Sequence, residues 1–209
     1  MDWEDAYQRN DTPWDKGEPS PGLVDMIQSR PLRGRILVPG CGSGHDVRAL
    51  AAVPGVFPVG LDISPSAVQR AHSFPKVGRE DYVAGDLFAL PETLMGAFDA
   101  VWEHTCFCAI PRARRADYVR GVHSALRPGG EFYAIYYLDP GMEDPEVGPP
   151  FDVSIAELNA RFLESGAFEL LEEWPPARAY PGREGREWMR HMRACGGWGT
   201  EGEGGQAGA

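Results

Sequence analysis

The fold of this chain is indicated by residues 35–46, which read RILVPGCGSGHD. Ile36–Val38 is a short apolar run, typical of a strand that is buried on both faces. Three glycines follow at alternate positions, and such a turn lets a ligand lie against bare main chain. Asp46–Ala52 then has the pattern of a helix start. Strand, glycine turn and helix together predict either a tight structural loop or a nucleotide-type site at the carboxyl edge of a parallel sheet.

The spacing of the glycines separates two classes of nucleotide site. They fall at positions 40, 42 and 44, which gives G-x-G-x-G. A dinucleotide fingerprint, G-x-G-x-x-G, would place its third glycine where this chain has His45. The spacing therefore speaks against a nicotinamide-dependent oxidoreductase, which we keep as the alternative class of enzyme.

A carboxylate follows the next predicted strand. Residues 56–61 form a second apolar run that ends at Asp62, 22 residues after Gly40. A carboxylate at this strand tip can accept hydrogen bonds from both hydroxyls of a ribose. Its alternative role is to cap the following helix, which Ser64 is better placed to do. With the glycine turn, Asp62 predicts a cofactor of the adenosine type.

A second aspartate follows the third predicted strand. Residues 81–84 read as a short strand, and Asp86 and Leu87 come directly after it and a glycine. The carboxylate of Asp86 could bind the exocyclic amine of an adenine while Leu87 packs against the ring. An aspartate that only shapes the turn is the other interpretation, and the residues alone leave both open.

Strands that alternate with helices predict an α/β class, with a doubly wound, mostly parallel sheet of seven strands. We expect one domain over residues 1–195 and a flexible tail over 196–209, where seven of the fourteen residues are glycine. The predicted strands are 36–38, 56–61, 81–84, 98–102, 131–138, 168–174 and an antiparallel edge strand 187–192. The predicted helices are 21–30, 46–52, 64–72, 112–126 and 154–165.

The first twenty residues carry more aromatic side chains than a disposable terminus needs. Trp3, Tyr7 and Trp14 stand among acidic residues in this segment. Each ring buries on the order of 150–250 Å² when packed, so the segment is expected to lie on the domain. It is either a strap that only packs there or a lid whose aromatic rings close over a ligand, and these residues fit both.

Composition excludes several function classes. The net charge of −11 argues against a nucleic-acid partner, because phosphate binding needs clustered Lys and Arg. No apolar run approaches the roughly 20 residues of a membrane span, and the acidic start does not resemble a signal peptide. Four cysteines without disulfide or zinc spacing predict reduced thiols and a cytoplasmic location.

Two short clusters resemble sites without having the required geometry. His104, Cys106 and Cys108 alternate on one segment with no fourth ligand nearby, which is a poor zinc pattern, so no metal is expected. His45 and Asp46 resemble a catalytic pair, but neighbouring residues at a helix start point in different directions. We therefore expect Asp46 to cap its helix, and no catalytic dyad is evident.

The residues that carry a family resemblance extend over most of residues 3–190. They are TPWD at 12–15 with Gly17, LVPGCGSGHDV at 37–47, LDIS at 61–64, FCAI at 107–110, RPGG at 127–130 and GPPF at 148–151. The chain resembles class I methyltransferases that use S-adenosylmethionine. More specifically it is similar to the thiopurine S-methyltransferase superfamily, in its branch of plant thiol, thiocyanate and halide methyltransferases and their bacterial relatives. The resemblance implies a Rossmann-like methyltransferase fold with S-adenosyl-L-methionine as cofactor.

The resemblance also implies roles for individual positions. Gly40 would face the methionine portion of the cofactor, Asp62 the ribose and Asp86 the adenine. Tyr137 matches a tyrosine that lines the acceptor site and is the implied catalytic residue. The implied cofactor-binding residues are Trp3, Tyr7, Trp14, Gly40, Asp62, Ile63, Asp86, Leu87 and His104. By placing the first three around the cofactor, the resemblance favours the lid over the strap.

One departure from the resemblance concerns the acceptor. Relatives usually read Asp-Tyr shortly before FCAI, whereas this chain has Glu103-His104-Thr105-Cys106. We expect methyl transfer to a small thiol or sulfide, since a soft nucleophile needs little help from a base. Halide or thiocyanate methylation, and methylation of a thiopurine or metalloid, are the nearest alternatives, and a cofactor-binding regulator without catalysis is a third class. The oligomeric state is left open.

Overall fold

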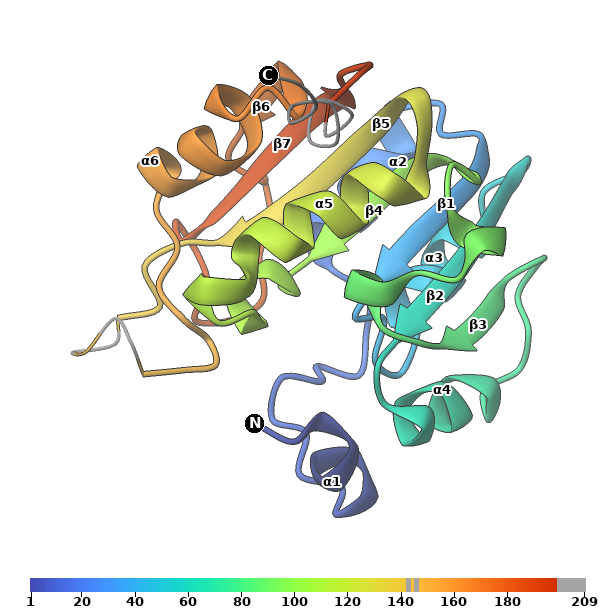
Figure 1. The fold of residues 1–209 in the computed structure, drawn as a ribbon. Coiled ribbons are helices and arrows are strands. Elements are labelled where there is room, and N and C mark those ends of the chain that lie inside the picture. The colour runs from blue at the N-terminus through green and yellow to red at the C-terminus, as the bar shows by residue number, and fades with distance from the viewer. Residues whose placement is uncertain (142–143, 145–146, 199–209) are drawn as a thin grey trace, which may run out of the picture.

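The computed structural model describes residues 1–141, 144 and 147–198, and its centre is a seven-stranded sheet (Figure 1). The strand order is β3-β2-β1-β4-β5-β7-β6. The strands are β1 (Gly34–Pro39), β2 (Val56–Asp62), β3 (Asp81–Ala84), β4 (Phe98–His104), β5 (Leu126–Tyr137), β6 (Phe168–Trp174) and β7 (Glu187–Ala194). Strands β1 to β5 pair in parallel, and β7 is antiparallel to both of its neighbours. The predicted fold class is confirmed. The predicted tail lies outside the described residues from residue 199 onward.

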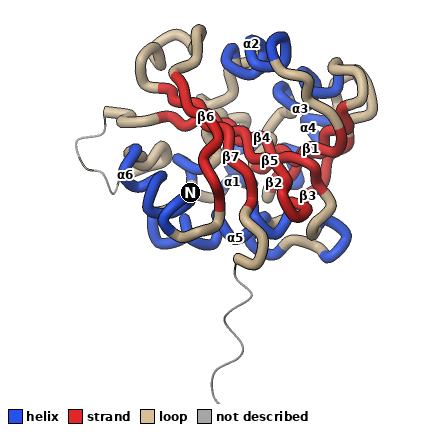
Figure 2. The backbone as a smooth tube through the Cα atoms, turned by 90° about the horizontal axis from the view of Figure 1, so that it is seen from above, coloured by secondary structure: helices blue, strands red, loops and turns tan. Residues whose placement is uncertain are grey.

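Helices cover both faces of this sheet, as the view from above shows (Figure 2). They are α1 (Trp3–Gln8), α2 (Pro21–Ser29), α3 (His45–Ala51), α4 (Pro65–His72), α5 (Arg115–Ala125) and α6 (Ile155–Leu158). One apolar cluster joins α2, α3 and α4 to the sheet, and a second joins α5 and α6 to the opposite face. The central strands β1 and β4 are therefore buried on both sides, as their continuous apolar runs predict.

Strand β7 is not at the edge of the sheet, so the predicted edge position of residues 187–192 is wrong. It pairs with β5 on one side and with β6 on the other. Its Arg190 is fully buried and binds Glu173 of β6 through Nε at 3.0 Å. The edge belongs to β6, whose exposed glutamates suit a strand that has one unpaired side.

Residues 154–165 form two kinds of helix where one was predicted. After α6 the chain widens into a π-helical turn over Asn159–Glu164. Phe162 in this turn is fully buried and packs between the rings of Phe132 and Phe168. Asn159 at its start accepts a hydrogen bond from Arg190 of β7 at 2.7 Å. The wider turn brings both side chains to partners that only tertiary packing supplies.

The predicted helix over residues 112–126 is also divided. It begins as a 3₁₀ turn at Arg112–Arg114, and α5 follows from Arg115. The Arg115 guanidinium is fully buried, donates to the Asp152 carbonyl at 2.9 Å and pairs with Glu157. This ion pair and hydrogen bond attach the start of α5 to the segment that leads into α6.

A buried glutamate shapes the turn after β4. The Glu103 carboxylate is fully buried and accepts the Phe107 N–H at 2.8 Å and the Tyr118 hydroxyl. Burial raises the pKa of Glu103 from 4.5 to about 7, although these hydrogen bonds act in the opposite direction. Glu103 thereby fixes the segment from Thr105 to Ala109 at the carboxyl end of the sheet.

This raised pKa makes a contribution to stability that depends on pH. Because the folded state holds the Glu103 proton more tightly than the unfolded chain, the contribution is fully present below pH 4.5 and is lost as pH rises through about 7. Between about pH 5 and about pH 8, we expect wild type to lose on the order of 2 kcal/mol of unfolding free energy relative to the isosteric variant Glu103→Gln. Urea denaturation at both pH values measures this. A wild-type minus variant difference that does not change with pH would contradict it.

Candidate functional site

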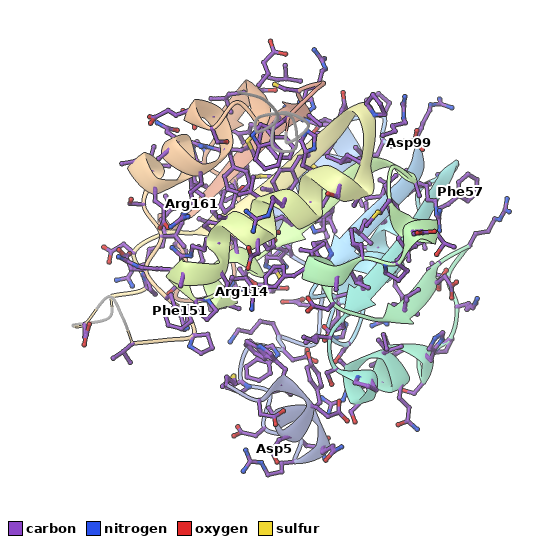
Figure 3. All side chains as sticks on the ribbon, viewed as in Figure 1. Asp5, Phe57, Asp99, Arg114, Phe151 and Arg161 are labelled. Atoms are coloured by element: carbon purple, nitrogen blue, oxygen red, sulfur yellow. The ribbon has the colours of Figure 1, made fainter. Side chains whose placement is uncertain are left out.

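A cavity of about 570 Å³ opens at the carboxyl ends of the parallel strands. This size lies within the range of small-molecule sites, roughly 300–1,000 Å³. In Figure 1, α1 lies beyond the arrowhead ends of β1 and β2, and its Trp3 and Tyr7 side chains line the cavity. Figure 3 shows that Arg114, another residue of the cavity wall, lies at the end of α5 that faces α1. All ten residues for which a site role was expected line the cavity: Trp3, Tyr7, Trp14, Gly40, Asp62, Ile63, Asp86, Leu87, His104 and Tyr137.

The glycine turn presents bare main chain to the cavity. Gly40, Gly42 and Gly44 have φ values of +61°, +52° and +74°, a region that side-chain-bearing residues rarely adopt. A Cβ at position 40 would lie 2.8 Å from the Cys106 sulfur, and one at position 42 would lie 2.6 Å from the Tyr7 hydroxyl oxygen. Cys106 and Tyr7, which come from two distant segments, therefore fill the space that side chains at positions 40 and 42 would need.

Asp62 is held at the tip of β2 beside this turn. Its carboxylate accepts the Gly42 N–H at 2.8 Å and the Ser64 N–H at 2.9 Å. Burial raises the pKa of Asp62, while these two hydrogen bonds act to lower it. Ser64, and not Asp62, caps α4, because its hydroxyl accepts the Ala67 N–H at 3.1 Å. The Asp62 carboxylate thus links the glycine turn to the end of β2 while lining the cavity.

Asp86 has the turn role that the sequence left open. Its Oδ1 accepts the Phe88 N–H at 2.8 Å and begins the 3₁₀ turn Leu87–Ala89. Asp86 and Leu87 also belong to the cavity wall, so the turn presents both side chains where an adenine was expected.

Polar contacts attach the amino-terminal segment to the domain. Glu4 accepts the hydroxyls of Ser64 and Ser66, both at 2.6 Å, and the Ser66 N–H at 3.0 Å. These hydrogen bonds lower the pKa of Glu4 to about 2 and place its charge at the positive end of α4. Asp15 binds the Ser43 hydroxyl and lies 3.0 Å from His45 Nε2. The segment is therefore anchored at both ends of its aromatic stretch.

The aromatic side chains of this segment gather over the cavity. The Trp3 and Trp14 rings meet edge to face with centroids 5.1 Å apart, and the Trp14 indole N–H donates to the Tyr7 hydroxyl at 3.2 Å. Residues 3–8 form α1, a helix that the sequence reading missed. Asp2 caps it by accepting the Asp5 N–H at 3.1 Å, and a cap residue before two acids is a signal that could have revealed it.

The other end of the cavity is built from segments after β4 and before β7. Cys106, Cys108 and Ile110 contribute from the first segment, and Tyr180 and Arg183 contribute from the second. The Arg183 guanidinium lies over the Tyr137 ring, 4.8 Å from its centroid, and 5.6 Å from that of Tyr180. Sequence spacing did not reveal Tyr180 and Arg183, because only the insertion of β7 beside β5 brings them there.

Asp46 does not cap its own helix, contrary to expectation. Its buried carboxylate accepts hydrogen bonds from the Ser20 N–H at 2.8 Å and from the Trp102 indole N–H at 2.7 Å. The Nδ1 atom of His104 lies 2.9 Å from the same carboxylate. Burial acts to raise the pKa of Asp46, but the charge of His104 and these hydrogen bonds outweigh it and lower the pKa. His45 turns away toward Asp15. Asp46 of α3 instead forms a dyad with His104 of β4, which the sequence did not show.

The described ranges 1–141, 144 and 147–198 hold neither a cluster of metal ligands nor a membrane-crossing helix. Within them, no three His, Cys, Asp or Glu side chains converge as a metal site. Over the same ranges, every helix is too short or too polar to cross a lipid bilayer.

Comparison with known proteins identifies the family. The model of the thiopurine S-methyltransferase family matches residues 1–175. Thiocyanate methyltransferase 1 of Arabidopsis thaliana is 35% identical over 190 residues, which covers 88% of this chain and 81% of that protein. The chain belongs to the thiopurine S-methyltransferase family. It is an S-adenosylmethionine-dependent methyltransferase, and this membership favours methyl transfer over the nicotinamide alternative.

Further similarities agree with this membership. A thiopurine S-methyltransferase of Xanthomonas campestris is 30% identical over 187 residues, covering 81% of this methyltransferase and 84% of the relative. Among solved structures, a Burkholderia thailandensis 1,6-didemethyltoxoflavin-N1-methyltransferase with bound S-adenosylhomocysteine has a TM-score of 0.71 at 17% identity. The match covers 93% of this chain and 86% of the chain in that structure, and it supports only the assignment of the fold.

The residues present fit an adenosyl methyl donor. The glycine turn presents bare main chain at Gly40 and Gly42 to the cavity, and the Asp62 carboxylate lies beside it. Asp62→Ala should weaken binding of S-adenosylhomocysteine by about 1–3 kcal/mol, the free energy of a lost charge-assisted hydrogen bond. Isothermal titration calorimetry measures this, with the exposed Glu92→Ala as the matched control for loss of one acidic charge. Equal affinity of wild type and the Asp62 variant would remove Asp62 from the site.

Proposed function

We propose that this methyltransferase transfers a methyl group from S-adenosylmethionine to a small soft nucleophile, a thiol or sulfide. The observation that carries the proposal is the composition of the cavity end around Tyr137. The cavity wall that includes Tyr137 also carries two thiols and several apolar side chains: Cys106, Cys108, Ile110, Pro111, Pro149 and Pro150. Such a wall suits a polarisable acceptor that needs few hydrogen bonds.

The donor would occupy the opposite end of the cavity. Gly40 would contact the methionine portion, Asp62 and Ile63 the ribose, and Asp86 and Leu87 the adenine. Trp3, Tyr7, Trp14 and His104 would surround it. S-adenosylmethionine supplies a methyl group already activated on a sulfonium, so the protein's own task is to position the acceptor and exclude water. Tyr137, under Arg183, is placed to orient the acceptor.

The enzyme's own thiols are kept from competing for the methyl group. Burial raises the pKa of Cys41 and Cys106 well above the ordinary range and that of Cys108 to about 12. A protonated thiol is a weak nucleophile, because the thiolate is the reactive form. Within the described part of the chain all four cysteines are unpaired thiols, which the expected reducing cytoplasm would preserve.

The acceptor class is tested by product analysis. We expect purified enzyme with labelled S-adenosylmethionine to methylate small thiols or hydrosulfide faster than thiocyanate, iodide, a thiopurine or a trivalent metalloid. Mass spectrometry of the products and the rate of S-adenosylhomocysteine formation give the order. Faster turnover of thiocyanate or iodide would move the function to that alternative, and no product from any acceptor would count against catalysis.

The amino-terminal segment is proposed to act as a lid over the donor. Deleting residues 1–18 should abolish turnover, because it removes Trp3, Tyr7 and Trp14 from the cavity wall along with Glu4 and Asp15. The rest of the domain should stay folded, since the seven-stranded sheet begins at Gly34. Circular dichroism and the turnover assay are the two measurements. Full turnover by the truncated protein would show that the segment is only a strap.

A further inference from the structure

His104 is held by a buried carboxylate and has a second nitrogen without a partner. Its Nδ1 lies 2.9 Å from an Asp46 oxygen, and Asp46 is fixed in turn by Ser20 and Trp102. Because a carboxylate accepts hydrogen bonds, Nδ1 carries the proton and Nε2 keeps a lone pair. Nε2 is buried, and it has no hydrogen-bond partner within the described ranges. An unpaired buried acceptor is costly, and a bound S–H donor would satisfy it.

Aromatic and charged side chains from other segments pack around His104. The Tyr180 ring stacks on the imidazole with centroids 5.7 Å apart, and its hydroxyl donates to the Glu18 carbonyl at 2.7 Å. Glu187 of β7 is fully buried, and its charge interacts with that of His104. Arg183, 3.5 Å from Glu187, is the opposing cation on this side. The imidazole therefore lies among two carboxylates, Asp46 and Glu187, and one guanidinium, that of Arg183.

We infer that His104 is the general base of methyl transfer and that the acceptor is a thiol that arrives protonated. The inference rests on the proposed function, because His104 and Tyr137 line one cavity. Nε2 takes the S–H proton, and the sulfur electron pair forms the new S–CH₃ bond. The electron pair of the broken S–CH₃ bond stays on the donor's sulfur. The products are the neutral methyl thioether of the acceptor, S-adenosylhomocysteine and an imidazolium, and the imidazolium returns its proton to water. An acceptor that is already an anion gains nothing from this step.

The test compares two thiols on the full-length enzyme. One is an alkyl thiol that is mostly protonated at neutral pH, and the other is an electron-poor aromatic thiol that is already ionised. His104→Gln removes the titrating nitrogen but keeps a hydrogen-bonding amide. We expect kcat/KM at about pH 7 to fall roughly 100-fold or more for the alkyl thiol and to change less than about threefold for the ionised thiol. The exposed His72→Gln is the control and should match wild type with both.

Other outcomes separate the possible failures. An equal loss with both thiols would show that His104 acts only through the donor, as one of the residues around it, and would overturn the inference. No loss with the alkyl thiol would overturn it as well. If wild type methylates neither thiol, the proposed function itself fails. Should the variant not fold, the wild-type pH profile decides: kcat/KM for the alkyl thiol should level off below the pKa of that thiol, and a rise that continues up to the thiol's own pKa would contradict a base.

Discussion

The hydrogen bond between the Asp62 carboxylate and the Gly42 N–H is the contact on which the site depends. It joins the tip of β2 to the turn after β1, so that two neighbouring strand ends present an acid and bare main chain to one cavity. The turn has this shape because its glycines adopt positive φ. Tyr7 and Cys106 then occupy the space that side chains at positions 42 and 40 would need. Substituting either glycine would displace one of these walls.

Charged groups, more than apolar packing, attach the cavity walls to this frame. Glu4 fastens α1 to the amino end of α4, and Asp15 fastens the following segment to Ser43. Asp46 joins α2, α3 and β4 by accepting three hydrogen bonds at a single buried carboxylate. Glu103 does the same for the turn after β4. Each carboxylate connects separate parts of the chain, so the geometry of the site depends on their protonation.

Features decided by local chemistry could be predicted from the sequence. The strand, glycine turn and helix over residues 35–52, the Ser64 cap and the acids after β2 and β3 all follow from short-range patterns. Seven of the ten expected residues line one cavity because parallel strands bring their carboxyl ends to the same edge, and the other three come from the amino-terminal segment. Their individual contacts with donor and acceptor remain predictions.

Features decided by tertiary pairing could not be predicted. The insertion of β7 between β5 and β6 depends on the hydrogen bonds of Arg190 with Glu173 and Asn159. This insertion brings Tyr180 and Arg183 to the cavity. The π-helical turn depends on the ring cluster around Phe162. Asp46 and His104 meet only once α3 lies against the sheet beside β4. No periodic pattern in the sequence predicts these contacts.

A crystal structure of the enzyme with S-adenosylhomocysteine tests the central claim most directly. We expect both ribose hydroxyls within hydrogen-bonding distance of the Asp62 carboxylate, the amino-acid portion against the main chain at Gly40, and the sulfur directed toward Tyr137. A ligand bound away from the glycine turn, or a ribose that Asp62 does not contact, would contradict it.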